Sequence, residues 1–166
     1  MRMQKGFTLV ELLVTVAVLA ILLAVAVPGF AEFIRAVRAS SDVSSLTAAL
    51  SLARSEAVKR NQPACIYSAS WGDGWEVRLD VNNNNSCADA GDTAVRAFGA
   101  VSAAAALAVQ EGGADSSQVV FNGGGRRQGS EYTIAYRSVA NECNPQRDRN
   151  LVVGPTGRTE IEACTP

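Results

Sequence analysis

The feature that most constrains this chain is a long apolar run near its N-terminus. Between Phe7 and Phe30 the only side chains with polar groups are those of Thr8, Glu11 and Thr15. At about 1.5 Å per helical residue the run reaches roughly 36 Å, enough to cross a hydrocarbon layer of about 30 Å. Residues 1–6 are basic, and no small-residue cleavage site of the secretory type follows the run. We therefore predict a membrane-spanning helix over residues 7–30.

An acidic side chain, Glu11, lies inside this run. A carboxylate within hydrocarbon costs about 2.5–3.5 kcal/mol on insertion scales, so such residues are rare and usually have a partner. The run contains no basic side chain that could pair with it. Either Glu11 has a partner outside its own helix, or the run is an ordinary signal anchor with Glu11 near the membrane surface.

A second helical pattern follows. The spacing continues past Pro28 and Gly29, so we predict a kink or melted turn there, and Asn61 and Pro63 should end the helix. Residues 31–62 thus form an amphipathic continuation that packs on the rest of the domain. Its apolar stripe is Val43, Leu46, Leu50, Ala53 and Ala57, and the charged residues Arg35, Arg38, Asp42, Arg54, Glu56, Lys59 and Arg60 lie mostly off that stripe.

Residues 63–166 have the pattern of short strands and turns. The stretch 100–109 fits either a short helix or a small-residue strand. Strands are predicted at 64–67, 75–80, 118–121, 132–136, 150–153 and 159–164, with turns or loops at 70–74, 112–117, 123–129 and 154–158, the turn at 123–129 being flexible and basic. In the second strand Trp75, Val77 and Leu79 share an apolar face, and Glu76, Arg78 and Asp80 share the other. We expect an α+β fold in which a long N-terminal helix packs on a small antiparallel β-sheet domain.

The loop 80–86 has two interpretations. Asp80, Asn82 and Asn84 imitate the start of a calcium-binding loop, but the sixth position is Asn85 and the twelfth is Gly91, where glycine and glutamate are required. An asparagine-rich hairpin loop is the better interpretation.

Four cysteines, all beyond the apolar run, are typical of an oxidising compartment. Three pairings exist. A Cys65–Cys87 bond would link the first strand to a loop, and a Cys143–Cys164 bond would cross-link the C-terminal tail. Free structural thiols are the alternative. The chain has no histidine and no Cys-x-x-Cys spacing, so we expect no zinc site.

Composition and motifs argue against catalysis. We find no nucleophile with a paired base and no metal constellation, and Gly123–Gly125 lacks the lysine of a phosphate-binding loop. We therefore expect no enzymatic activity and no cofactor. The formal net charge is −1 and becomes −3 without Arg2 and Lys5, which disfavours non-specific nucleic-acid binding by the domain as a whole.

The segment from Gly6 to Leu13, GFTLVELL, resembles the class III signal of type IV pilins and type II secretion pseudopilins. The resemblance implies cleavage between Gly6 and Phe7 by a prepilin peptidase and N-methylation of Phe7. It also implies that Glu11 pairs with the N-terminus of a neighbouring subunit and so fixes the register of assembly. The leader would be residues 1–6, the inner-membrane and fibre-core helix residues 7–30, and the periplasmic domain would follow.

Residues 53–61, followed by Gly74, Trp75, Val77 and Asp80, resemble the GspH/FimT branch of that family, which includes FimU. The resemblance implies a pilin-like fold and a minor pilin that helps prime or cap fibre assembly. A GspH-type pseudopilin of a type II secretion system is the first alternative. Partners would be other minor and major pilins or pseudopilins, and inner-membrane lipid.

The tail from Leu151 to Arg158, with a late cysteine, looks like the C-terminal hairpin of FimT and FimU. Some FimT-type proteins bind DNA through basic tail residues, so a DNA-binding tip pilin is a second alternative. Glu160 and Glu162 weigh against DNA binding. From residue 122 onward the chain has six basic residues and five acidic ones, so the tail has little net positive charge. The candidate DNA contacts are Arg126, Arg127, Arg147, Arg149 and Arg158.

Overall fold

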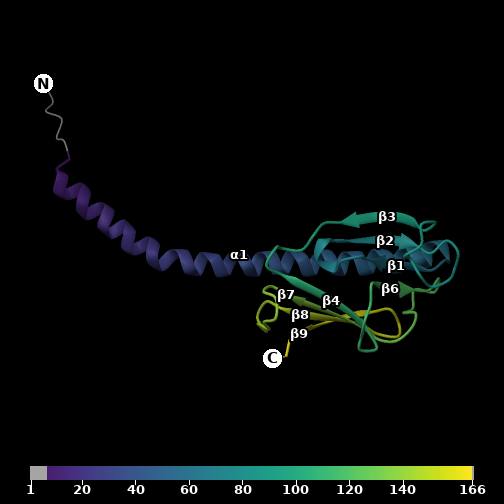
Figure 1. Cartoon of the computed structure of the whole chain (residues 1–166). Helices are drawn as coiled ribbons and strands as arrows, with labels where there is room; N and C mark the ends of the chain where they lie inside the picture. Colours follow the sequence, from purple (N-terminus) through teal and green to yellow (C-terminus); the bar gives the residue numbers. More distant parts are fainter. Residues whose placement is uncertain (1–6, 166) are drawn as a thin grey trace, which may run out of the picture. The chain divides into compact units, whose positions relative to one another are not determined.

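The computed structural model describes residues 7–165, apart from the side chain of Pro28. The chain divides into two units, with the boundary between Val37 and Arg38. The first unit holds the start of helix α1 (Leu9–Arg60). The second holds the remainder of α1, a short 3₁₀ helix η1 (Trp71–Asp73) and all the strands (Figure 1).

The first unit is helical from Leu9 onward. Its helix starts with a local cap, because the Glu11 N–H donates a hydrogen bond of 3.2 Å to Thr8 Oγ1. The helix is continuous through Pro28 and Gly29, so the predicted continuation is confirmed and the melted turn is absent there. Within α1, an 18-residue window reaches a mean hydropathy of 2.9, which is apolar enough for a membrane span.

In the second unit, α1 buries the predicted apolar stripe. Leu46, Leu50, Ala53 and Ala57 are at most 1% exposed, whereas Val43 is partly buried. The helix ends at Arg60, where Asn61 adopts a left-handed φ of 49° and the Gln62 N–H donates to Ala57 O. Ala39 and Ala49 add small residues to the same buried face, which lets the sheets approach the helix closely.

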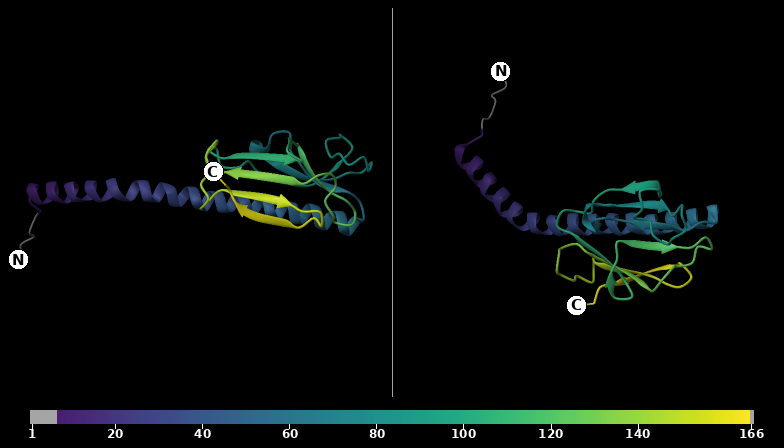
Figure 2. Two further views of the ribbon diagram at one scale, coloured as in Figure 1. Left: turned by 90° about the horizontal axis from the view of Figure 1, so that it is seen from below. Right: turned by 45° about the vertical axis from the view of Figure 1, so that its right-hand side comes forward.

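Two antiparallel sheets pack with this part of α1 (Figure 2). The four-stranded sheet has the order β3 (Thr93–Phe98), β2 (Trp75–Leu79), β1 (Ala64–Tyr67) and β6 (Gln118–Phe121). The five-stranded sheet has the order β5 (Ala114–Asp115), β4 (Ala106–Glu111), β7 (Tyr132–Arg137), β8 (Arg149–Val153) and β9 (Thr159–Ala163). A single apolar cluster joins the helix to both sheets, with Leu46, Trp75, Phe121, Tyr136 and Leu151 among its members.

The α+β fold prediction is confirmed, with two sheets where the sequence indicated one. The six predicted strands are present. The stretch 100–109, for which helix and strand were both possible, ends in strand β4. Strand β3 was not predicted, because as an edge strand it has an irregular pattern of exposure. The predicted loop 112–117 contains the two-residue strand β5.

One side-chain placement was wrong. Asp80 was predicted to share the polar face of its strand with Glu76 and Arg78, yet it is completely buried. Strand β2 ends at Leu79, so the alternation stops there. The Asp80 carboxylate turns inward to accept backbone N–H groups of the following loop.

Candidate functional site

The first candidate site is the start of α1. Gly6 lies outside the described residues, so the predicted cleavage position is described only on its Phe7 side. Phe7 is 82% exposed, and the Glu11 side chain is also exposed. Within residues 7–165 the Glu11 carboxylate has no hydrogen-bond or ion-pair partner. A carboxylate near the end of an apolar helix is therefore left available to a positive group from another chain.

The same part of the helix exposes apolar side chains on all of its faces. Leu12, Leu13, Leu19 and Leu22 are each 57–61% exposed, and none of the residues from Phe7 to Val27 is buried. A helix that is apolar all round is stable only inside lipid or inside a bundle of other helices. The segment therefore needs an apolar environment around it, either lipid or other helices.

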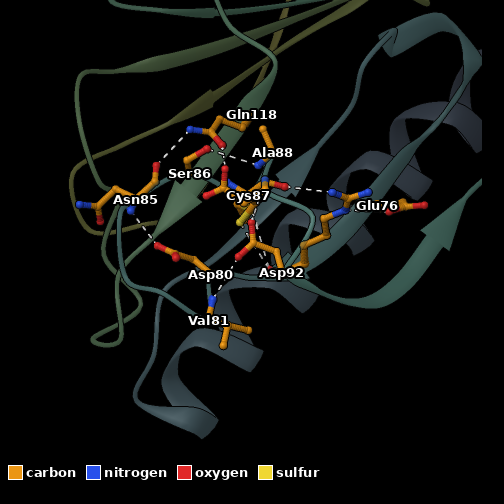
Figure 3. Close-up of a disulfide and its surroundings, with 12 residues drawn as sticks. Glu76, Asp80, Val81, Asn85, Ser86, Cys87, Ala88, Asp92 and Gln118 are labelled. Atoms are coloured by element: carbon orange, nitrogen blue, oxygen red, sulfur yellow. Dashed lines mark hydrogen bonds and ion pairs between the residues drawn. A yellow bond between two sulfur atoms is a disulfide. The ribbon is translucent and has the colours of Figure 1, made fainter.

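The second candidate site is the loop from Asp80 to Asp92, which the Cys65–Cys87 disulfide ties to strand β1 (Figure 3). Asp80 Oδ2 accepts the Asn85 N–H at 2.7 Å, and Asp80 Oδ1 accepts the Asn84 N–H at 3.2 Å. The Gln118 side chain, from β6, accepts the Cys87 N–H and donates to Asn85 O. The Asp80 oxygens are thus used by the backbone of an asparagine-rich loop that joins β2 to β3.

Polar side chains at the tip of this loop form hydrogen bonds with one another. Asn82 and Asn84 each donate to Asp89 Oδ2, at 3.1 and 2.6 Å. These two hydrogen bonds favour the charged carboxylate and lower the pKa of Asp89. Asn83 and Asn85 take left-handed φ values of 57° and 63°, which asparagine tolerates better than most residues. The four consecutive asparagines therefore have a conformational role.

The second disulfide, Cys143–Cys164, joins the β7–β8 loop to the chain end beyond β9. Beside it lies Asp148, which is completely buried. Asp148 Oδ1 accepts the Ser138 N–H at 2.8 Å, and Oδ2 accepts the Asn144 N–H at 2.9 Å. Burial raises the pKa of Asp148, but hydrogen bonds from Ser138 and Asn144 outweigh it and leave the pKa below its usual value.

The five candidate arginines fall into two groups. Arg126, Arg127 and Arg158 lie in the β6–β7 and β8–β9 connections, whereas Arg147 lies in the β7–β8 loop and Arg149 begins β8. The two groups are at opposite ends of β8, whose five residues span roughly 13 Å at about 3.3 Å each.

The second group is engaged in local contacts. Arg149 donates to the carbonyl oxygens of Pro145, Gln146 and Asp148, and Arg147 Nε donates to Ser138 Oγ. The structure therefore brings Arg126, Arg127 and Arg158 to one end of the sheet and keeps Arg147 and Arg149 apart from them.

The glycine-rich connection 123–129 is packed against α1. Gly125 is buried, and its carbonyl oxygen accepts a 3.0 Å hydrogen bond from Arg54 Nε. A Cβ on Gly157 would lie 2.1 Å from that same carbonyl oxygen, so the β8–β9 turn can approach only because residue 157 is glycine. The connection was predicted to be a flexible basic turn; instead it is fixed between the helix and the neighbouring turn.

Two helix residues have roles that the sequence pattern did not reveal. Arg54 holds the Gly125 carbonyl, as described above. Asp42 Oδ2 accepts hydrogen bonds from the Tyr136 hydroxyl at 2.8 Å and from the backbone and hydroxyl of Ser102. Burial, together with the Asp42 carboxylate, raises the pKa of Tyr136. Each partner is at least 60 residues away in sequence, so no local signal could have identified these contacts.

A family model described as type II transport protein GspH matches residues 42–157, and one described as a prokaryotic N-terminal methylation motif matches residues 1–27. No curated protein matches the chain.

Two crystal structures of the type IV minor pilin FimU from Pseudomonas aeruginosa are similar in fold. The first is 21% identical, covers 80% of this chain and 92% of its own, and has a TM-score of 0.56. The second is 22% identical, covers 74% of this chain and 91% of its own, and has a TM-score of 0.54.

Proposed function

The chain belongs to the GspH family, and from that premise we propose that it is a minor pilin, a structural subunit that helps to prime or cap assembly of a type IV pilus. The observation that carries the proposal is the start of α1. There an N-terminal methylation motif leads into the exposed apolar segment of residues 7–30, whose one carboxylate, Glu11, has no partner within residues 7–165. A subunit that assembles through this helix needs both its apolar surface and its unpaired charge.

The proposed mechanism is packing. A prepilin peptidase cuts between Gly6 and Phe7, which creates a new amine that is then methylated. Before assembly the helix spans the inner membrane, with the disulfide-bonded domain in the periplasm. During assembly the helix moves into the fibre core. Glu11 pairs there with the N-terminal amine of a neighbouring subunit, and this ion pair sets the axial register.

A pseudopilin of a type II secretion system is the first alternative, because the GspH family model is named for that pathway. The likeness to the FimU minor pilin favours the pilus. DNA binding by the tail is the weaker alternative, because the arginines proposed for it divide between two ends of β8 and two of them are held by local contacts.

A deletion strain separates the two fibre systems. Surface pili and secreted proteins are measured in the same culture, and the intact gene is restored on a plasmid as the control. We expect surface pili to be lost and secretion to stay normal. Normal pili with lost secretion would make the chain a pseudopilin, and no change in either would contradict a fibre role.

A further inference from the structure

We propose that the groove between α1 and the start of strand β9 receives an extended, acidic segment of a neighbouring pilin-like subunit, which continues along β9 and adds a strand to the five-stranded sheet. This inference rests on the proposed role as a fibre subunit and assigns one of its contact surfaces. The groove has a volume of about 620 Å³. Its α1 wall includes Leu50, Arg54, Ser55, Val58 and Lys59, and its other wall is Gly157, Arg158 and Thr159.

The first argument is the open edge of the sheet. In the described residues β9 pairs with β8 alone, at the end of the strand order. The Gly154 N–H donates to Arg158 O, and the Cys164 N–H donates to Asp148 O. In an antiparallel pair the hydrogen-bonded positions recur every second residue, so Glu160 and Glu162 bond to β8. Thr159, Ile161 and Ala163 therefore direct their backbone N–H and C=O groups outward.

The second argument is an apolar side chain left uncovered at this edge. Ile161 pairs directly with Leu151 in the β8–β9 register, so both side chains point to the same face of the sheet. Leu151 is fully buried on that face, yet Ile161 is 49% exposed. Val58, on the helix wall of the groove, is 54% exposed. An added strand would cover these apolar groups.

The third argument is charge. Arg54, Lys59 and Arg158 line the groove, and within residues 7–165 neither Arg54 nor Arg158 has an ion pair with a carboxylate. Lys59 forms a long ion pair with Glu56, with 3.8 Å between Nζ and Oε1, and its side chain is 74% exposed. A strand has a side-chain period of two, and Arg158 and Ile161 are three residues apart, so an acidic residue placed near Arg158 and an apolar one near Ile161 would face opposite sides of the added strand. The preferred partner segment has an acidic residue near Arg158 and an apolar residue near Ile161.

A polypeptide fits these features better than a nucleic acid does. An open row of backbone donors and acceptors is used by an added strand, whereas phosphates need only the cations. The exposed Ile161 and Val58 side chains would also gain nothing from a phosphate backbone.

Photo-crosslinking in the full-length chain tests the proposal. Ser55, an exposed residue of the groove, is replaced by p-benzoylphenylalanine in cells that assemble fibres, and Glu160, on the other face of β9, carries the same group as a control. We expect the Ser55 probe to form an adduct with an acidic, extended segment of another prepilin-type subunit, identified by mass spectrometry. The Glu160 probe should not give that adduct.

Charge variants show whether the groove cations select the segment. Arg158→Glu should reduce the adduct at least about tenfold, because like charges now face each other at the contact. Arg126→Glu changes an exposed arginine outside the groove and should leave the yield unchanged. An acid-to-lysine change in the crosslinked segment should restore the adduct of Arg158→Glu.

Several outcomes would overturn the proposal: no adduct at Ser55, an adduct with lipid, nucleic acid or a helical segment, or a yield that Arg158→Glu leaves intact. A failure of this kind in a strain that needs the chain for pili would remove the groove contact and leave the fibre role standing. A strain with normal pili and normal secretion after deletion would remove the fibre role itself.

Discussion

At the scale of single residues, Glu11 is the position on which the proposed assembly role depends. It is an acidic residue in the first turn of an apolar helix, and its side chain is exposed. Its backbone N–H is already satisfied by Thr8, so the carboxylate is not needed to cap the helix. We therefore propose that the carboxylate contacts another chain.

We predict that Glu11→Ala leaves the amount of chain in the membrane unchanged and lowers its incorporation into sheared fibres by about tenfold or more, since an ion pair within hydrocarbon would be lost. Immunoblots of membrane and fibre fractions measure both. The matched control is Glu32→Ala, in the same helix, which loses a surface ion pair with Arg35. Normal incorporation of Glu11→Ala would remove its proposed role in register.

A second residue-scale prediction concerns alkaline pH. Burial, aided by the Glu111 carboxylate, raises the pKa of Tyr132 to about 12. The folded state therefore retains the phenol proton at a pH where the unfolded chain loses it. Stability should fall as pH rises from about 10 to 12. Urea unfolding of the detergent-solubilised chain should show this slope, and Tyr132→Phe should reduce it; an identical slope in the variant would contradict the assignment.

At the scale of elements, strand β9 has one bonded and one open edge, and proline substitution can tell them apart. Glu160→Pro removes an N–H that donates to β8, whereas Ile161→Pro removes an outward one. Both change one residue of the same strand. We expect Glu160→Pro to lower the free energy of unfolding by about 1–3 kcal/mol more than Ile161→Pro does. Equal losses in urea unfolding would show that the register assigned to the open edge is wrong.

The elements also show what a sequence can and cannot predict. Strong alternation in Trp75, Val77 and Leu79 identified β2, because that strand has one buried face. Strand β3 gave no such signal. It pairs with β2 at the edge of the sheet, and its own side chains are mostly exposed. Asp80 was misplaced because its partners are backbone N–H groups of a loop, which residue identities do not reveal.

At the scale of the whole molecule, the apolar run and the methylation motif predicted a long helix that carries a β-rich domain. The way in which the domain closes on α1 could not be predicted. It depends on Arg54 reaching Gly125 and on Asp42 reaching Tyr136, contacts that span 71 and 94 residues. Side chains that look like a solvated helix face in the sequence thereby become the links between the helix and its domain.

The central claim is that this chain is a processed subunit of a surface fibre. The most direct test is mass spectrometry, under non-reducing conditions, of fibres sheared from intact cells. We expect a chain that begins with N-methylated Phe7 and holds the Cys65–Cys87 and Cys143–Cys164 disulfides. A chain found only in the membrane fraction, with residues 1–6 still attached and Phe7 unmodified, would contradict the claim.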